Sequence, residues 1–142
     1  MLKRLSVLLI VGLVCFSVNA QCKRFTKKKC FSELGEYVFN GQLNTVVLSS
    51  GEEAELRLSF YSKQGYRIYT CAEEQLGDVD FEIMDTDRNI LYKSKENGSK
   101  IFDFKVPSTQ QLIVRVIVVR EKTEHALDFQ GCVSVLVGFL EE

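Results

Sequence analysis

The sequence contains one histidine, one proline and no tryptophan, and these scarcities limit what the protein can be. Any catalytic triad built on histidine must use His125, which lies in the polar stretch Thr123-Glu124-His125-Ala126, with neither a nucleophile elbow nor a metal motif. No two cysteines have C-x-x-C spacing, so the sequence fits no zinc pattern. We therefore expect His125 to be a solvated loop residue and the protein not to be an enzyme.

Long apolar runs are also scarce, and the one present is at the N-terminus. Lys3 and Arg4 precede an apolar run over residues 5–18, which ends at Val18-Asn19-Ala20. This order predicts a secretory signal peptide over residues 1–20, cleaved after Ala20. The run is shorter than the roughly 20 apolar residues of a membrane-spanning helix. We expect an exported protein, periplasmic or extracellular, with no membrane span after cleavage.

Charge is distributed unevenly along the predicted mature chain. Its 16 basic and 19 acidic residues give a net charge of about −3, yet five of the basic residues lie within residues 23–29. Such a cluster could contact nucleic acid, anionic lipid or an acidic partner. Because the rest of the domain would repel polyanions, we expect no nucleic-acid binding and interpret the cluster as a solvated helical face or a mobile arm.

The number of cysteines is the one expected of an exported protein. Cys15 leaves with the signal peptide, and the four remaining cysteines allow three disulfide pairings. In a helix, Cys22 and Cys30 would lie about 12 Å apart along the axis, too far for a disulfide. We predict that Cys71 pairs with Cys132, since both lie on expected core strands. The weaker candidate pair is Cys22 with Cys30, which would require this segment not to be helical.

The chain from residue 42 onward has the pattern of strands and turns. Residues 54–60, 79–83 and 101–106 alternate between apolar and polar side chains, which is typical of strands with one buried face. Residues 112–119 and 132–139 are apolar on both faces and rich in valine, which indicates central strands. Asn97-Gly98 predicts a tight hairpin turn. About eight strands at this spacing favour an all-β fold, a two-sheet antiparallel sandwich.

The N-terminal part of the predicted mature chain differs from the rest. Residues 22–34 favour one short helix, with Phe31 and Leu34 facing inward and Gly35 ending it. We divide the chain into the signal peptide (1–20), a basic helical segment packed on the domain (21–40) and a β-sandwich domain (41–142).

Several stretches resemble a group of small secreted bacterial proteins of unassigned function. They include Gly41-Gln42-Leu43-Asn44, Gly51-Glu52-Glu53-Ala54-Glu55-Leu56 and the closing residues 131–139. Residues 77–83 and the turn at residues 85–89 are similar to the strand–turn–strand of pre-peptidase C-terminal domains, which are jelly-roll sandwiches. Both resemblances imply a non-catalytic, jelly-roll-like β-sandwich in the envelope or outside the cell.

Acidic residues provide the one candidate metal site. Asp85, Asp87, Asn89 and Glu96 have the spacing of an EF-hand calcium loop, but Ile90 occupies the position where that loop needs glycine. An ordinary Asx-type turn is therefore expected at Asp85. A looser calcium site remains a hypothesis, and calcium is the only cofactor that the sequence suggests. Its candidate ligands are Asp78, Asp80, Asp85 and Asp87.

Three functions follow from these observations. The leading hypothesis is a non-catalytic binding or structural module of the bacterial cell envelope, with a protein or glycan partner. Exposed tyrosines, with Tyr61, Tyr66 and Tyr92 as candidates, could pack on that partner. The alternatives are a calcium-dependent accessory or adhesion domain and an unrecognised hydrolase, in which acidic residues and His125 would meet in one pocket.

Overall fold

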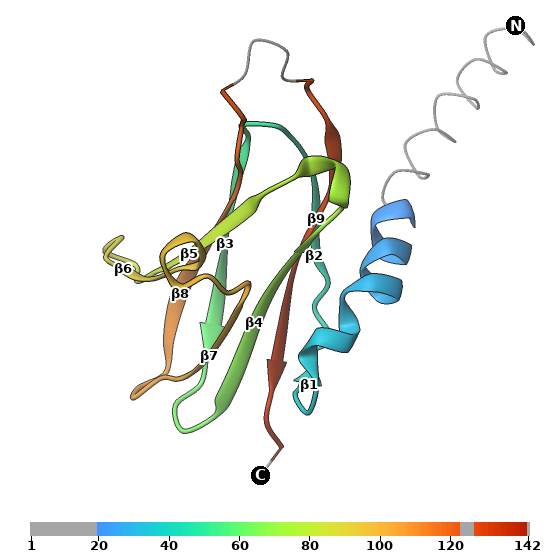
Figure 1. The fold of residues 1–142 in the computed structure, drawn as a ribbon. Helices are drawn as coiled ribbons and strands as arrows, with labels where there is room; N and C mark the ends of the chain where they lie inside the picture. Colours follow the sequence, from blue (N-terminus) through green and yellow to red (C-terminus); the bar gives the residue numbers. More distant parts are fainter. Residues whose placement is uncertain (1–19, 123–126, 142) are drawn as a thin grey trace, which may run out of the picture.

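Two antiparallel sheets pack face to face in the computed structural model, which describes residues 20–122 and 127–141 (Figure 1). One sheet has the order β1-β9-β4-β7, with β2 also paired to β9, and the other has the order β3-β8-β5-β6. The predicted all-β sandwich is confirmed. The strands are β1 (Val38–Phe39), β2 (Asn44–Ser49), β3 (Glu53–Phe60), β4 (Gly65–Ala72), β5 (Val79–Met84), β6 (Ile90–Lys93), β7 (Ile101–Lys105), β8 (Gln110–Val118) and β9 (Gln130–Phe139).

Helical structure is limited to short segments in this part of the chain. A helix at residues 20–29, called here the N-terminal helix, leads into a 3₁₀ turn at Phe31–Leu34, a second 3₁₀ turn covers Glu74–Leu76, and α2 covers Ser94–Asn97. No helix among the described residues has the length and apolar content needed to cross a bilayer. The predicted signal peptide lies outside the described residues, except for Ala20.

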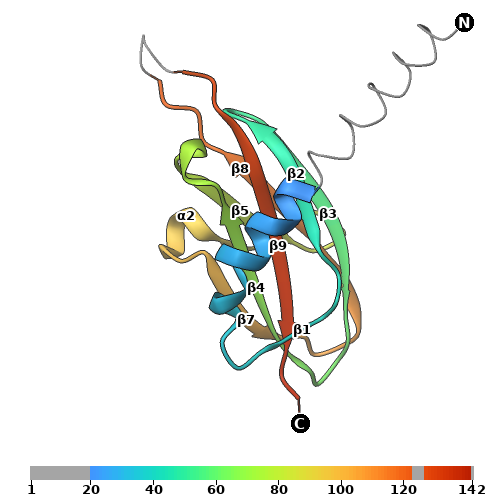
Figure 2. The same ribbon diagram turned by 90° about the vertical axis from the view of Figure 1, so that its right-hand side faces the viewer.

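Strand β9 explains why one sequence stretch is apolar on both faces. Val133, Val135 and Val137 point into the core between the sheets. Leu136 instead belongs to a second cluster with Cys30 and Leu34, on the outer face of the same sheet. The N-terminal helix covers that outer face and lies across β9 (Figure 2). Both faces of β9 are therefore buried, as the sequence predicted for a central strand.

The helix and β9 match each other in spacing. Cys22, Thr26 and Cys30 lie four residues apart and are all buried, which places them about 6 Å apart along the helix axis. Alternate residues of β9 are about 6.7 Å apart, so Cys132 can meet Cys22 while Ser134 meets Thr26. The observed contacts are the Cys22–Cys132 disulfide and a 2.5 Å hydrogen bond between the Thr26 and Ser134 hydroxyls.

The disulfide pairing differs from the prediction. The bonds join Cys22 to Cys132 and Cys30 to Cys71, with Cα–Cα separations of 5.4 and 5.9 Å. The predicted Cys71–Cys132 bond is wrong because Cys71 is opposite Ser134, two residues away from Cys132, and both cysteines face the helix. The weaker candidate, Cys22–Cys30, is excluded because residues 22–29 are helical. The inward positions of Phe31 and Leu34 are confirmed.

The predicted hairpin at Asn97-Gly98 is also wrong. Strand β6 pairs with β5 in one sheet, whereas β7 pairs with β4 in the other. The connection must therefore cross the sandwich, which a two-residue hairpin turn cannot do. It forms the short helix α2, and Gly98 caps it in the left-handed conformation with φ 66°. The sequence correctly indicated a glycine with positive φ at this position, but this glycine ends a helix and not a hairpin strand.

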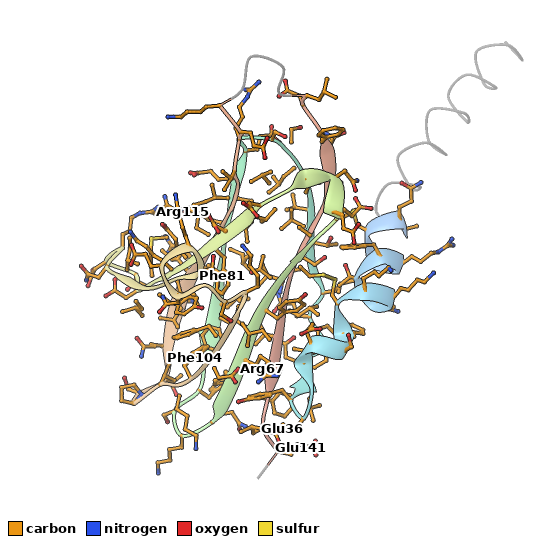
Figure 3. All side chains as sticks on the ribbon, viewed as in Figure 1. Glu36, Arg67, Phe81, Phe104, Arg115 and Glu141 are labelled. Carbon is orange, nitrogen blue, oxygen red and sulfur yellow. A yellow bond between two sulfur atoms is a disulfide. The ribbon has the colours of Figure 1, made fainter. Side chains whose placement is uncertain are left out.

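A chain of aromatic rings closes the sandwich on the side of β6 and β7. Phe81, Tyr92, Phe102 and Phe104 follow one another with ring-centroid separations of 5.3, 4.3 and 5.0 Å. Phe60 continues the chain, 5.1 Å from Phe104. Phe81 and Phe104 are seen between the two sheets in Figure 3. The rings fill this side of the core, so the two sheets are joined here by side-chain packing.

Candidate binding surface

The acidic residues proposed for calcium do not converge. Asp78 precedes β5 and Asp85 follows it, and seven extended residues span about 23 Å. The Asp80 carboxylate lies 3.2 Å from the Lys100 ammonium group. Across residues 20–122 and 127–141, no three histidine, cysteine or acidic side chains form a group that could hold a metal ion. This arrangement gives the calcium hypothesis no support.

The turn after β5 is the predicted Asx turn. The Asp85 carboxylate accepts hydrogen bonds from the Asn89 backbone N–H and the Asn89 side-chain amide, both at 2.9 Å. These bonds stabilise the ionised form and lower the pKa of Asp85. The carboxylate oxygens are therefore already used by the turn itself.

Other acidic side chains on the strands form ion pairs with arginines. Glu82, which shares a strand face with Asp78 and Asp80, forms an ion pair with Arg115 on the neighbouring strand. Glu55 pairs with Arg88, and this hydrogen-bonded contact lowers the pKa of Glu55. The Glu82–Arg115 pair links two strands of one sheet, and the Glu55–Arg88 pair links β3 to the turn between β5 and β6. Glu55 and Glu82 therefore have a structural role in this sheet. His125 lies outside the described residues.

The side of the sandwich formed by β2 and β3, away from β6 and β7, is open. Strand β2 pairs only with β9 and β3 only with β8, so each has one unpaired edge. Two hollows of about 630 and 370 Å³ lie beside these edges, the first near the end of β3 and the second near its beginning. Together we call them the edge groove, and its lining includes Gln42, Leu43, Val46, Leu56, Leu58, Tyr61, Val135 and Val137.

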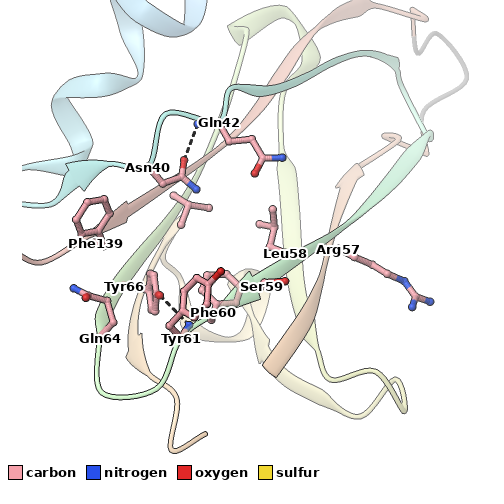
Figure 4. Close-up of a pocket in the computed structure, with 11 residues that line it drawn as sticks. Asn40, Gln42, Arg57, Leu58, Ser59, Phe60, Tyr61, Gln64, Tyr66 and Phe139 are labelled. Carbon is pink, nitrogen blue, oxygen red and sulfur yellow. Dashed lines mark hydrogen bonds between the residues drawn. The ribbon is translucent and has the colours of Figure 1, made fainter. Parts of the chain in front are cut away.

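The larger hollow combines an apolar floor with a polar rim, in which Arg57 is the one charged residue (Figure 4). Leu58 and Val137 reach it from opposite sheets, whereas the amide side chains of Asn40, Gln42 and Gln64 lie around it. The Asn40 side chain accepts the Gln42 backbone N–H at 3.0 Å, which orders this part of the rim. The lining can offer hydrogen bonds and apolar contact, but it holds no carboxylate, imidazole or thiol.

Tyr61 stands at one end of the groove. Its side chain is 65% exposed, and its backbone N–H is held by the Tyr66 hydroxyl at 2.9 Å. Of the three tyrosines considered from the sequence, Tyr61 is exposed, Tyr66 is buried and Tyr92 is partly buried in the aromatic chain. An exposed ring on a backbone that is held in place can act as a rigid contact.

Sequence reasoning did not find the edge groove. Its residues come from β2, β3, β4, β8, β9 and the connections between them, so no local motif marks it. The only signal in the sequence was the candidate exposed tyrosine. Which strands have unpaired edges depends on sheet order, and periodicity carries no information about that order.

Comparison with known proteins adds a likeness in fold. No protein-family model matches the chain, and no curated protein matches it. Among solved structures, the chain is similar to PliG of Aeromonas hydrophila, a periplasmic lysozyme inhibitor of g-type lysozyme. The alignment covers 74% of this chain and 88% of PliG, with a TM-score of 0.53 and 10% identity. At this identity the likeness concerns the fold alone.

Proposed function

We propose that this protein is a non-catalytic, exported binding module of the bacterial cell envelope, which holds an extended segment of a partner protein in the edge groove. The observation that carries the proposal is the pair of unpaired strand edges, β2 and β3, beside hollows that offer both apolar and polar contacts. An unpaired strand edge offers backbone N–H and C=O groups to an added strand. Pockets beside it can then select alternate side chains of that strand.

Three further observations support this function. Two disulfides suit an oxidising compartment outside the cytoplasm. The lining of the larger hollow has hydroxyl groups and one arginine, but no carboxylate or imidazole that could act as the base beside a nucleophile. The structurally similar PliG inhibits its target and is itself periplasmic, so this fold can serve a non-catalytic binding role.

The test begins by trapping the partner at the groove. A photo-crosslinking amino acid is placed at Tyr61, and a matched control carries it at Leu91, which is 53% exposed on β6. After irradiation of intact cells, we expect one protein to be crosslinked from position 61 and not from position 91. That protein is then identified by mass spectrometry and purified.

Affinity measurements with the purified partner complete the test. Tyr61→Ser removes the exposed ring, and Val46→Lys places a charge beside the β2 edge, where Val46 is 39% exposed. We expect each change to weaken binding at least tenfold, as for an interface hot spot, and Leu91→Lys to have no effect. Equal affinities for all variants would refute the groove as the binding site. G-type lysozyme is the first defined protein to include, with inhibition of cell-wall lysis as the readout.

A further inference from the structure

The exposed residues of the N-terminal helix are all basic apart from Ala20 and Gln21, and Phe25 is partly buried. Its five basic residues are all exposed, whereas the inward positions, Cys22, Thr26 and Cys30, are buried. Side chains on the outer side of this helix project away from the sheet (Figure 3). We call this surface the basic face, and it consists of Lys23, Arg24, Lys27, Lys28 and Lys29.

The basic face is unfavourable for the helix that carries it. Lys23 and Lys27 are four residues apart, as are Arg24 and Lys28, and like charges at this spacing destabilise a helix. None of the five basic side chains forms an ion pair with the rest of the described chain. The helix keeps its place through a disulfide at each end and the buried Thr26 between them. Five cations are thus presented on a fixed scaffold without internal compensation.

The chemistry of the face indicates what it would contact. Four of its five cations are lysines, which act as point charges without the planar fork that arginine uses for directional recognition. No exposed large apolar side chain lies on the helix, so the face lacks the anchors that dominate protein interfaces. A convex surface of this kind suits a diffuse layer of negative charge, such as lipid headgroups.

We propose that the basic face docks the protein on an anionic phospholipid bilayer. The rest of residues 21–142 contains 11 basic and 19 acidic residues, so a negative bilayer repels the body and attracts the helix. This asymmetry orients the molecule with the helix toward the lipid and leaves the edge groove, on another side of the sandwich, free. Because the attraction is electrostatic and not assisted by apolar insertion, it must weaken as salt shortens the screening length.

Vesicle binding tests the proposal with the oxidised mature protein. Vesicles contain either phosphatidylcholine alone or phosphatidylcholine with 30% phosphatidylglycerol, and bound protein is measured by co-sedimentation at low and at physiological salt. We expect binding to the anionic vesicles only, and at least tenfold weaker binding at the higher salt.

Matched charge variants locate the binding surface. One variant carries Lys23→Ser, Lys27→Ser and Lys28→Ser, and the control carries Lys95→Ser, Lys105→Ser and Lys122→Ser, three exposed positions elsewhere. Both lose three charges, and circular dichroism and thermal melting establish that both fold. We expect the helix variant to bind at least tenfold more weakly and the control to change less than threefold.

Three outcomes would overturn the proposal: the wild-type protein does not bind anionic vesicles, it binds neutral vesicles equally well, or the helix variant and the control variant lose the same amount of vesicle binding. If the wild type does not bind vesicles and the helix variant no longer binds a protein partner, the basic face would be assigned to protein recognition instead. The Tyr61→Ser variant distinguishes lipid docking from partner binding in the edge groove, because it should bind vesicles as the wild type does.

Discussion

At the scale of single residues, Thr26 is one of the few fully buried polar residues in the described part of the chain. Its side chain is fully buried, and its hydroxyl contacts both the Cys22 carbonyl, at 2.8 Å, and the Ser134 hydroxyl, at 2.5 Å. Ser134 is also fully buried and contacts the Thr45 hydroxyl at 3.2 Å. The helix therefore docks on β9 through a small hydrogen-bonded network, and a buried group that loses its partner in such a network is costly.

Thr26→Val keeps the shape of the side chain but removes its hydroxyl. We expect the free energy of unfolding to fall by about 1–2 kcal/mol, because Ser134 loses its shortest partner. The measurement is urea unfolding with both disulfides intact. In the double variant Thr26→Val/Ser134→Ala both partners are apolar, so the loss should be smaller than the sum of the two single losses. Simple additivity would mean that the two hydroxyls do not interact.

A second residue, Arg67, secures the turn that follows the helix. Its guanidinium group forms two 2.7 Å hydrogen bonds with the Asp103 carboxylate and donates to the Glu33 carbonyl at 3.1 Å. It also lies over the Tyr37 ring, 4.5 Å from the centroid. The bonds with Asp103 raise the pKa of Arg67. Arg67 thereby links β4, β7 and the 3₁₀ turn, so this end of the helix has support besides its disulfide.

At the scale of elements, the two ends of the N-terminal helix are held differently. After Cys30 the chain continues into the 3₁₀ turn, where Leu34 packs on β9 beside Gly138. A Cβ at Gly138 would lie 2.7 Å from the Tyr37 Cβ, so glycine is needed for this close approach. At the other end, the disulfide from Cys22 is the covalent anchor. The two disulfides should therefore protect the helix unequally.

Removing each disulfide separately tests this asymmetry. The bonds close loops of 110 and 41 residues, so each removal should cost about 4–5 kcal/mol in the chain-entropy model. In Cys22→Ala/Cys132→Ala the helix loses its anchor, and we expect trypsin to cut within residues 23–29 before it cuts after Arg57 in β3. In Cys30→Ala/Cys71→Ala we expect no such early cut. Equal cutting of the helix in both variants would contradict the asymmetry.

At the scale of the whole molecule, the two sides of the sandwich are not equivalent. The side of β6 and β7 is closed by aromatic rings, and the Tyr92 hydroxyl donates to the Ser99 carbonyl at 2.9 Å. The side of β2 and β3 has the longer unpaired edges and the edge groove. Binding at the open side and lipid contact through the helix would therefore use different surfaces of one scaffold.

The dispersed acidic residues lead to a prediction for calcium. Asp78 and Asp85 lie at opposite ends of β5, and Asp80 and Asp85 already have partners. We therefore expect the melting temperature of the oxidised protein to be the same with millimolar calcium and with chelator. A ligand present at 100 times its dissociation constant would add about 2.7 kcal/mol, which a thermal melt detects readily. A clear rise of the melting temperature with calcium would contradict this prediction and make the acidic turn a metal site again.

Local patterns in the sequence were sufficient to determine the sandwich. The strands at residues 54–60 and 112–119 followed from their periodicity, and the Asx turn at Asp85 followed from side-chain chemistry. The helical segment that stops at Gly35 was also predicted, although it divides into a helix ending at residue 29 and a 3₁₀ turn. These features depend on residues that are close in the chain, whose preferences for a buried face or a turn are readable directly.

The tertiary structure alone decided the disulfide pairing, the crossing at Asn97-Gly98 and the edge groove. Each depends on which strands become neighbours, and a strand's side-chain pattern is the same whatever its neighbour. Cys71 and Cys132 had the pattern of core positions, yet their disulfide partners lie directly after the N-terminal helix and within it, 41 and 110 residues earlier in the chain. Sheet order, rather than the preference of any single residue, therefore determined which cysteines form disulfides and where the edge groove lies.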